Sequence, residues 1–217
     1  KTVGIGLLIQ IIIAIGVIKI SWIKGFFEYI SGFFVNILEY TQAGTQMLFG
    51  EFASIDQYGF IFVFQALPII IFFSALTSLL YYFGILQNLV SALAWSLRKL
   101  LGISGAESLA VAGNIFLGQT EAPLLIKAYL EKMTRSELFL VMVGGMATVA
   151  GSVMGAYIGF LGGSDPVQRL EFSKSLLAAS VMAAPGAVVI AKIVFPQKDK
   201  IPELIKIPSN SVGNNFL

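Results

Sequence analysis

An apolar stretch at residues 113–123 carries the side chains that could do chemistry. Its polar residues are Asn114, Gln119, Thr120 and Glu121, and Pro123 follows them. One acidic side chain at the centre of a membrane helix costs about 2.5–3.5 kcal/mol, so such groups persist where they line a polar cavity. Amide, hydroxyl and carboxylate groups placed there can bind a polar solute or a cation. Glu121 and its neighbours are therefore candidates for a binding site inside a membrane.

The composition of the chain predicts an all-α integral membrane protein. Its 217 residues are 57% hydrophobic and 12% charged, and the mean hydropathy is +0.86. Four apolar runs are long enough to cross a hydrocarbon core of about 30 Å as helices. These runs are residues 3–20, 60–85, 138–161 and 172–195. They lack the alternating pattern of a membrane β-barrel, and a lipid-facing backbone is otherwise helical.

The residue types that are missing argue against an enzyme and against a nucleic-acid partner. The chain has no cysteine and no histidine, which excludes disulfides, thiolate or imidazole metal ligands, and catalysis by either side chain. Glu121 with Thr120 is a thin constellation for an intramembrane enzyme. The formal charge of +2 comes from scattered residues and forms no basic face for a nucleic acid.

The polar residues sit at the bend of a predicted re-entrant hairpin, residues 104–133. Ser104 and Glu107 match a capping box that begins a helix, and this helix ends near Leu117. Its length of about 20 Å is too short to cross the membrane. A second short helix begins near Thr120 and returns to water at Lys132. Discontinuous helices of this kind form the substrate sites of secondary transporters.

The basic residues give the orientation. If the spans alternate and the hairpin enters and leaves on one side, that side receives most of the 14 basic residues and is cytoplasmic. The exceptions, on the other side, are Lys19, Lys24, Arg169 and Lys174.

The elements around the hairpin have their own signals. After the first span, Trp22, Phe26 and Ile30, continuing to Phe33 or Phe34 and Ile37, recur at helical spacing opposite Lys24, Glu28, Ser31 and Glu39. This pattern predicts an interfacial amphipathic helix or, equally, an aromatic stripe packed against neighbouring helices. Residues 91–101 read as a short interfacial segment.

The remaining signals concern helix starts, bends and packing. Thr134 and Glu137 match a second capping box, and Gln65 is assigned a structural role. Pro68 and Pro185 predict kinks. The small residues between Gly144 and Gly155 predict close helix packing or local unwinding.

Residues 113–124, Gly-Asn-Ile-Phe-Leu-Gly-Gln-Thr-Glu-Ala-Pro-Leu, followed by Lys-Met-Thr-Arg-Ser-Glu-Leu-Phe at residues 132–139, resemble the first re-entrant hairpin and following helix of concentrative nucleoside transporters. The resemblance extends loosely through residues 43–46, 67–68 and 183–185. Members of that family are longer and carry a second half. The resemblance therefore implies a fragment with scaffold-like spans at residues 1–101, transport-region helices at residues 102–197, and a polar tail at residues 198–217 that leads into the second half.

The same resemblance implies a set of site residues. Gln119, Thr120, Glu121 and Val153 would form the nucleobase side of the pocket. A sodium ion would bind to the side chains of Asn114 and Thr148 and the backbone carbonyls of Leu117 and Val149. Two alternatives stay open from the residues themselves: Asn114 could cap a freed backbone group, and Glu121 could lock the hairpin tip by an internal hydrogen bond.

The expected function is sodium-coupled uptake of nucleosides across the cytoplasmic membrane, by a protein that relatives assemble as a homotrimer in the lipid bilayer. A proton-coupled nucleoside transporter is one alternative. The other is a gate-type membrane protein with a structural or signalling role and no transport of nucleosides.

Overall fold

The computed structural model describes residues 2–198, and these residues form helices joined by short turns without any strand. In chain order the elements are α1 (Thr2–Lys19), α2 (Ser21–Phe49), the 3₁₀ turn η1 (Gly50–Ala53), α3 (Ile55–Tyr58), α4 (Phe62–Tyr82), α5 (Ile85–Leu101), α6 (Gly105–Gly113), α7 (Ala122–Leu125), the 3₁₀ segment η2 (Lys127–Lys132), α8 (Arg135–Ala147), α9 (Gly151–Gly162) and α10 (Pro166–Val194). The all-α prediction is confirmed. Apart from Lys198, the predicted polar tail lies outside the described residues.

Four segments are long and apolar enough to span a membrane, as predicted. They are Thr2–Lys19, Phe62–Tyr82, Arg135–Gly162 and Pro166–Val194. The third is not one helix: α8 and α9 are separated by a non-helical stretch at residues 148–150. The second and fourth continue through Pro68 and Pro185, which lie inside α4 and α10.

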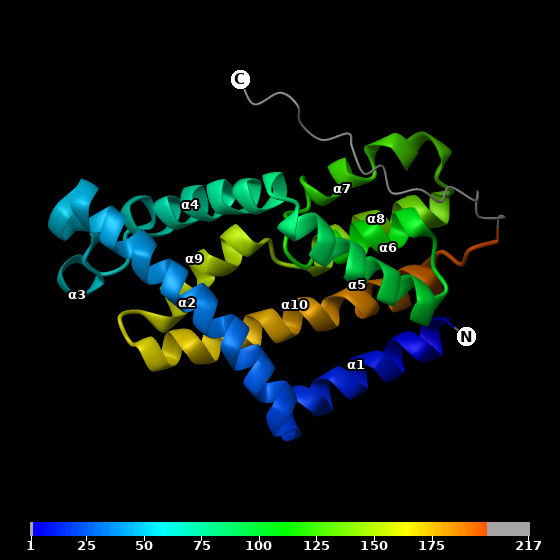
Figure 1. Cartoon of the computed structure of the whole chain (residues 1–217), viewed down its shortest axis with the longest axis horizontal. Coiled ribbons are helices and arrows are strands. Elements are labelled where there is room, and N and C mark those ends of the chain that lie inside the picture. Colours follow the sequence, from blue (N-terminus) through cyan, green and yellow to red (C-terminus); the bar gives the residue numbers. More distant parts are fainter. Residues whose placement is uncertain (1, 199–217) are drawn as a thin grey trace.

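The long helices pack around α10. Figure 1 shows α1 lying alongside α10, α2 crossing it diagonally and α4 running beside α9. Contact between α1 and α10 is close at Gly6, where an added Cβ would lie 2.5 Å from Val189 Cγ2. One turn further along α1, Gln10 Nε2 donates to the backbone carbonyl of Met182 at 3.2 Å. This polar contact between two spans was not predicted.

Residues 104–133 leave one end of the bundle and return to the same end. Glu107, at the start of α6, forms an ion pair with Lys192, near the end of α10. Lys192 Nζ also donates to Ser136 Oγ at the start of α8, at 3.1 Å, and Ser136 Oγ donates to the Phe195 carbonyl at 2.7 Å. The segment between Glu107 and Ser136 therefore folds back on itself, opposite the end that holds α3 and the α9–α10 turn (Figure 1).

Both predicted capping boxes are present, because this motif depends only on residues three apart in sequence. The Ser104 N–H donates to Glu107 Oε2 at 2.8 Å, and the Glu107 N–H donates to Ser104 Oγ at 3.2 Å. At the start of α8 the Thr134 N–H donates to Glu137 Oε2 at 2.8 Å, and Thr134 Oγ1 accepts from the Glu137 N–H at 3.3 Å.

The predicted structural role of Gln65 is also confirmed. Its Oε1 accepts from the Ile61 N–H at 2.8 Å, and its Nε2 donates to the Gly59 carbonyl at 2.9 Å. The side chain thus satisfies backbone groups at the start of α4, where no preceding helical turn is available to pair them.

Three boundaries differ from the prediction. The helix after the hairpin bend has only four residues in α7 and continues as the 3₁₀ segment η2. The segment placed at residues 91–101 begins at Ile85, and the preceding span ends at Tyr82. Gly84 separates them with a left-handed φ of +76°, a conformation that glycine adopts without strain.

The inward face of α2 includes only part of the predicted stripe. Trp22 is 81% exposed, and Phe26 and Phe33 also point away from the described helices. The buried positions include Phe27, Ser31 and Leu38. Of the predicted stripe, Ile30, Phe34 and Ile37 belong to the apolar cluster against α4, α9 and α10. The packed stripe is therefore confirmed at Ile30, Phe34 and Ile37 and fails at Trp22 and Phe26, because both faces of α2 carry large apolar side chains and hydrophobicity alone does not separate lipid-facing from buried positions. The interfacial location stays a prediction.

Candidate functional site

The bend of the hairpin lies against the break between α8 and α9. The Gly151 N–H, at the start of α9, donates to the Phe116 carbonyl in the bend at 3.0 Å. An added Cβ on Gly118 would lie 3.4 Å from Ala150 Cβ, and one on Gly145 would lie 3.1 Å from Gln119 Cβ. The structure therefore brings the polar bend into contact with the non-helical residues 148–150.

Glycines on α8 and α9 make this contact possible. A Cβ on Gly144 would lie 3.2 Å from Asn114 Nδ2, and one on Gly151 would lie 3.0 Å from the Phe116 oxygen. Both distances are shorter than ordinary van der Waals contact, so a larger residue at either position would displace the bend. The close packing predicted for the small residues between Gly144 and Gly155 is confirmed, and their partner includes the hairpin bend.

Asn114 is buried without a hydrogen bond to its side chain. It is 1% exposed, and among the described residues neither Nδ2 nor Oδ1 has a partner. Its backbone N–H bonds to the Ala110 carbonyl, but its side chain caps nothing. The capping alternative is therefore wrong. An unsatisfied buried polar group costs about 1–3 kcal/mol, which suits a group that is completed by a bound ligand.

Thr148 stands at the first non-helical position after α8. Its backbone is extended, with φ −113° and ψ 159°, and its Oγ1 donates to the Gly144 carbonyl at 3.0 Å. Asn114 and Thr148 therefore both contact Gly144. The Thr148 oxygen keeps lone pairs that can accept a cation.

The carbonyls of Leu117 and Val149 lie in the bend and in the break, where helical pairing fails. Among the described loops, turns and helix caps, no backbone N–H donates to either oxygen. Unwound carbonyls of this kind coordinate sodium ions in transporters with broken helices. Together with Asn114 and Thr148, they supply the neutral oxygen ligands that an alkali cation prefers.

The three tip side chains are more accessible. Gln119, Thr120 and Glu121 are all exposed, and Glu121 Oε2 accepts from the Gly118 N–H at 3.4 Å. This internal contact is the tip-locking bond considered for Glu121. Val153, partly buried on α9, follows Val149 by one helical turn. Gln119 is therefore an exposed residue whose Cβ lies next to Gly145 on α8.

Two sets of contacts that hold the hairpin in place were not predicted. The apolar side of α5, including Leu86, Val90 and Ala94, packs against both arms of the hairpin in one buried cluster. Glu107 is fully buried, and Lys192 neutralises it from α10. The only sequence signal for this pair was an acidic residue in a capping box followed by an apolar helix, since such a residue needs a cation when it is buried.

Comparisons with known proteins agree with this geometry. The family model described as "Na+ dependent nucleoside transporter N-terminus" matches residues 1–52, and the one described as "Nucleoside recognition" matches residues 63–164. Sodium/nucleoside cotransporter 1 of Rattus norvegicus is 45% identical over 202 residues, which are 92% of this chain and 29% of that protein. The chain belongs to the concentrative nucleoside transporter family.

Other proteins resemble it to a similar degree. Sodium/nucleoside cotransporter 2 of Rattus norvegicus is 43% identical over 218 residues, 99% of this chain and 31% of that protein. An uncharacterized transporter of Haemophilus influenzae is 47% identical over 173 residues, 77% of this chain and 39% of that protein. The solved structure of CNTnw in an inward-facing substrate-bound state has a TM-score of 0.85 and 39% identity, covering 97% of this chain and 50% of CNTnw.

This chain thus spans between 29% and 50% of the length of these proteins. Its membership confirms the resemblance found in residues 113–124 and 132–139. As the family and the four apolar spans indicate, the chain is part of a multi-pass integral membrane protein of a transporter family.

Proposed function

We propose that the full-length protein takes up nucleosides across the cytoplasmic membrane by secondary active transport coupled to sodium. The match to a sodium-dependent family and the names of the sodium/nucleoside cotransporters support this proposal. The observation that carries it in the structure is the Asn114 amide, buried without a partner beside Gly144 at the break of a membrane-spanning segment.

The proposed sodium site combines Asn114 Oδ1, Thr148 Oγ1 and the carbonyls of Leu117 and Val149. It is supported by the position of Asn114 and Thr148 next to Gly144 and by the lack of a backbone N–H donor to either carbonyl among the described loops, turns and helix caps. Sodium travels here as a co-transported substrate. All four ligands are neutral oxygens that do not titrate near neutral pH. Protons therefore do not compete with sodium for them.

The proposed nucleoside contacts are Gln119, Thr120, Glu121 and Val153. The Gln119 amide offers two donors and an acceptor, which match the N–H and C=O groups along a nucleobase edge. Thr120 supplies a hydroxyl, and Glu121 can accept through a bridging water while it holds the tip. Val153 supplies an apolar wall.

The two sites share one piece of structure, so their ligands are expected to help each other. Sodium at the bend would hold Leu117 against Val149, and Gln119 is two residues from Leu117. Ordering the bend for one ligand lowers the cost of ordering it for the other. The coupling is positive and, for binding, equal in both directions.

The proposal includes a moving part and its surroundings. The hairpin would dip into the bilayer from the cytoplasmic side, and residues 102–197 would move against a scaffold within residues 1–101, in a homotrimer. Such movement has to accommodate the Gln10–Met182 bond between α1 and α10.

The test is uptake of labelled uridine by the purified full-length protein in proteoliposomes. An inward sodium gradient should drive accumulation, and replacing sodium with choline should remove most of it. Asn114→Ala should raise the sodium concentration for half-maximal uptake at least several-fold, whereas Asn36→Ala, at an exposed position on α2, should not. Uptake that follows a proton gradient and ignores sodium would overturn the ion assignment, and failure to take up any nucleoside would overturn the function.

A further inference from the structure

Arg169 is a buried cation beside the turn between α9 and α10, far from the hairpin. Arg169 is 7% exposed. A Cβ on Gly162 would lie 2.6 Å from Arg169 Cγ and 2.8 Å from its Cα, so only glycine allows the side chain to lie across the end of α9. Gly163, at φ +54°, presents its carbonyl to Arg169 Nε at 2.7 Å. Gly162 and Gly163 therefore provide the space and one hydrogen-bond acceptor for this guanidinium.

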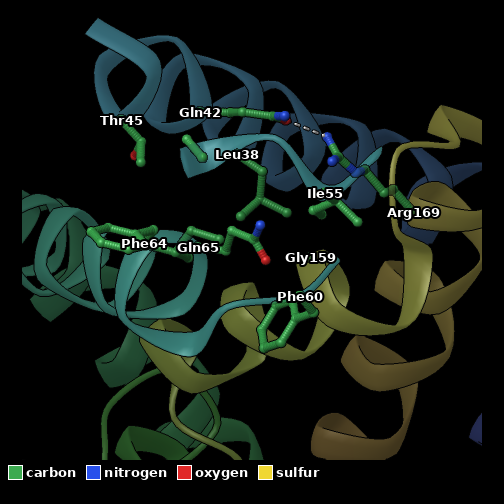
Figure 2. Close-up of a pocket in the computed structure, with 11 residues that line it drawn as sticks. Leu38, Gln42, Thr45, Ile55, Phe60, Phe64, Gln65, Gly159 and Arg169 are labelled. Carbon is green, nitrogen blue, oxygen red and sulfur yellow. Dashed lines mark hydrogen bonds between the residues drawn. The ribbon is translucent and has the colours of Figure 1, made fainter. Parts of the chain in front are cut away.

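The Arg169 guanidinium makes few hydrogen bonds at this position. Besides the Gly163 carbonyl, Arg169 Nη1 donates to Gln42 Oε1 on α2 at 3.0 Å (Figure 2). A guanidinium has five N–H donors, and these two bonds use two of them.

No carboxylate pairs with Arg169 among residues 2–198. The ion pairs of this region belong to other cations: Lys174 pairs with Glu28 and Glu171. Glu39 acts on Arg169 only at longer range, and Asp56 accepts a bond from Ser164 Oγ at 3.0 Å instead. Buried charges in proteins are paired, because an isolated ion in a low-dielectric interior is strongly disfavoured. Among the described residues Arg169 has Glu39 only at longer range, and a closer anion would stabilise its largely buried charge.

A small cavity lies beside this guanidinium, between α2, α4, the turn after α3, and α9 (Figure 2). Its polar lining consists of Arg169, Gln42, Thr45 and Gln65, and its other walls are mainly apolar. The volume of about 30 Å³ exceeds what one water requires and is far below the several hundred Å³ of a pocket for a drug-sized ligand. A monatomic anion fits; a nucleoside does not.

Two amides can complete the coordination of an anion. Gln42 turns its oxygen to Arg169, which leaves its Nε2 hydrogens without that partner, and Gln65 Nε2 uses one bond, to the Gly59 carbonyl. Arg169 is the charged residue in the cavity lining and the amides are neutral, so the lining favours a monovalent anion.

We infer that this cavity is a chloride site in which Arg169 is the charged ligand and the Gln42 amide the second donor. Chloride there would join α2 to the α9–α10 turn and close the end of the bundle opposite the hairpin. The site requires neither sodium nor a nucleoside, so it stands or falls independently of the transport activity.

The experiment measures thermal unfolding of the purified full-length protein in N-methyl-D-glucamine salts, with no sodium and no nucleoside. Exchanging gluconate for chloride at equal ionic strength, about 150 mM, should raise the midpoint by roughly 2 °C or more. Arg169→Gln should lose this chloride-dependent increment. The matched variant Lys174→Gln, which removes a paired cation on the same helix, should lower the midpoint but keep the increment.

Two further tests do not depend on whether Arg169→Gln folds. Gln42→Leu leaves the arginine in place and should reduce the increment, and bromide in place of chloride should give an anomalous scattering peak beside Arg169 in a crystal of the wild-type protein. Equal midpoints in chloride and gluconate would overturn the inference. So would an increment produced by phosphate but not by chloride, or a carboxylate from elsewhere in the protein seated against the guanidinium.

Discussion

Two adjacent glycines on α8 offer a way to separate the cation site from the nucleoside site. Gly144→Ala places a methyl group 3.2 Å from Asn114 Nδ2, whereas Gly145→Ala places one 3.1 Å from Gln119 Cβ. Each distance is a few tenths of an ångström short of normal contact, so Asn114 must give way in the first variant and Gln119 in the second. The two substitutions are chemically identical and one residue apart, which makes each the control of the other.

The magnitudes decide what these variants do. Crowding a packed site costs about 1–3 kcal/mol. Replacing glycine by alanine inside a helix returns about 0.5–1 kcal/mol, so α8 as a whole loses little stability. The cost of crowding is therefore expected as weaker ligand binding at the site, and not as lower stability of the protein. A loss of about 1.4 kcal/mol in the free energy of sodium binding corresponds to a tenfold higher half-maximal sodium concentration.

The assay is uridine uptake in proteoliposomes, titrated with sodium and then with uridine. Gly144→Ala should raise the half-maximal sodium concentration about three- to tenfold, and Gly145→Ala should mainly raise the uridine KM. Gly32→Ala on α2, where an added Cβ meets nothing within 4 Å, should change neither. If Gly144→Ala takes up uridine with the wild-type sodium requirement, Asn114 does not bind the ion and the proposed cation site is wrong.

Three further variants test single contacts. Gln119→Ala should raise the uridine KM without reducing the amount of protein in the membrane, and an unchanged KM would remove Gln119 from the site. Lys192→Met leaves the buried Glu107 carboxylate unpaired and should destabilise the protein by about 3–5 kcal/mol in thermal unfolding, with partial recovery in the double variant with Glu107→Gln; equal losses in both would show that the charge is not the cause. Gln65→Leu frees two backbone groups at the start of α4 and should lower stability by about 1–3 kcal/mol, a loss that Gln87→Leu on α5 should not reproduce.

Features set by neighbours in sequence could be predicted, and features set by distant contacts could not. The capping boxes of Ser104 and Thr134 involve residues three apart, and the four spans follow from composition over about 20 residues. The Glu107–Lys192 pair joins residues 85 positions apart, and the Gln10–Met182 bond joins residues 172 apart. No local pattern identifies which of many lysines or carbonyls becomes the partner.

The candidate site shows the same division. Polar residues in an apolar segment identified Asn114 and Gln119, because their cost in a membrane does not depend on the fold. The lack of any partner for the Asn114 amide needed coordinates. So did the position of the break: α8 ends before Thr148 rather than at one of its glycines, because the bend of the hairpin bonds to Gly151 there.

The bond between the Gly151 N–H and the Phe116 carbonyl has a consequence for how this region can change shape. In an uninterrupted helix that N–H would bond to the carbonyl four residues earlier, that of Ala147. A single hydrogen serves either the hairpin or the straight rod. Joining α8 and α9 into one helix therefore requires the bend to withdraw from Gly151. The Val149 carbonyl would then be taken up by the continuous helix. If the proposed cation site is correct, formation of this continuous helix would release the ion.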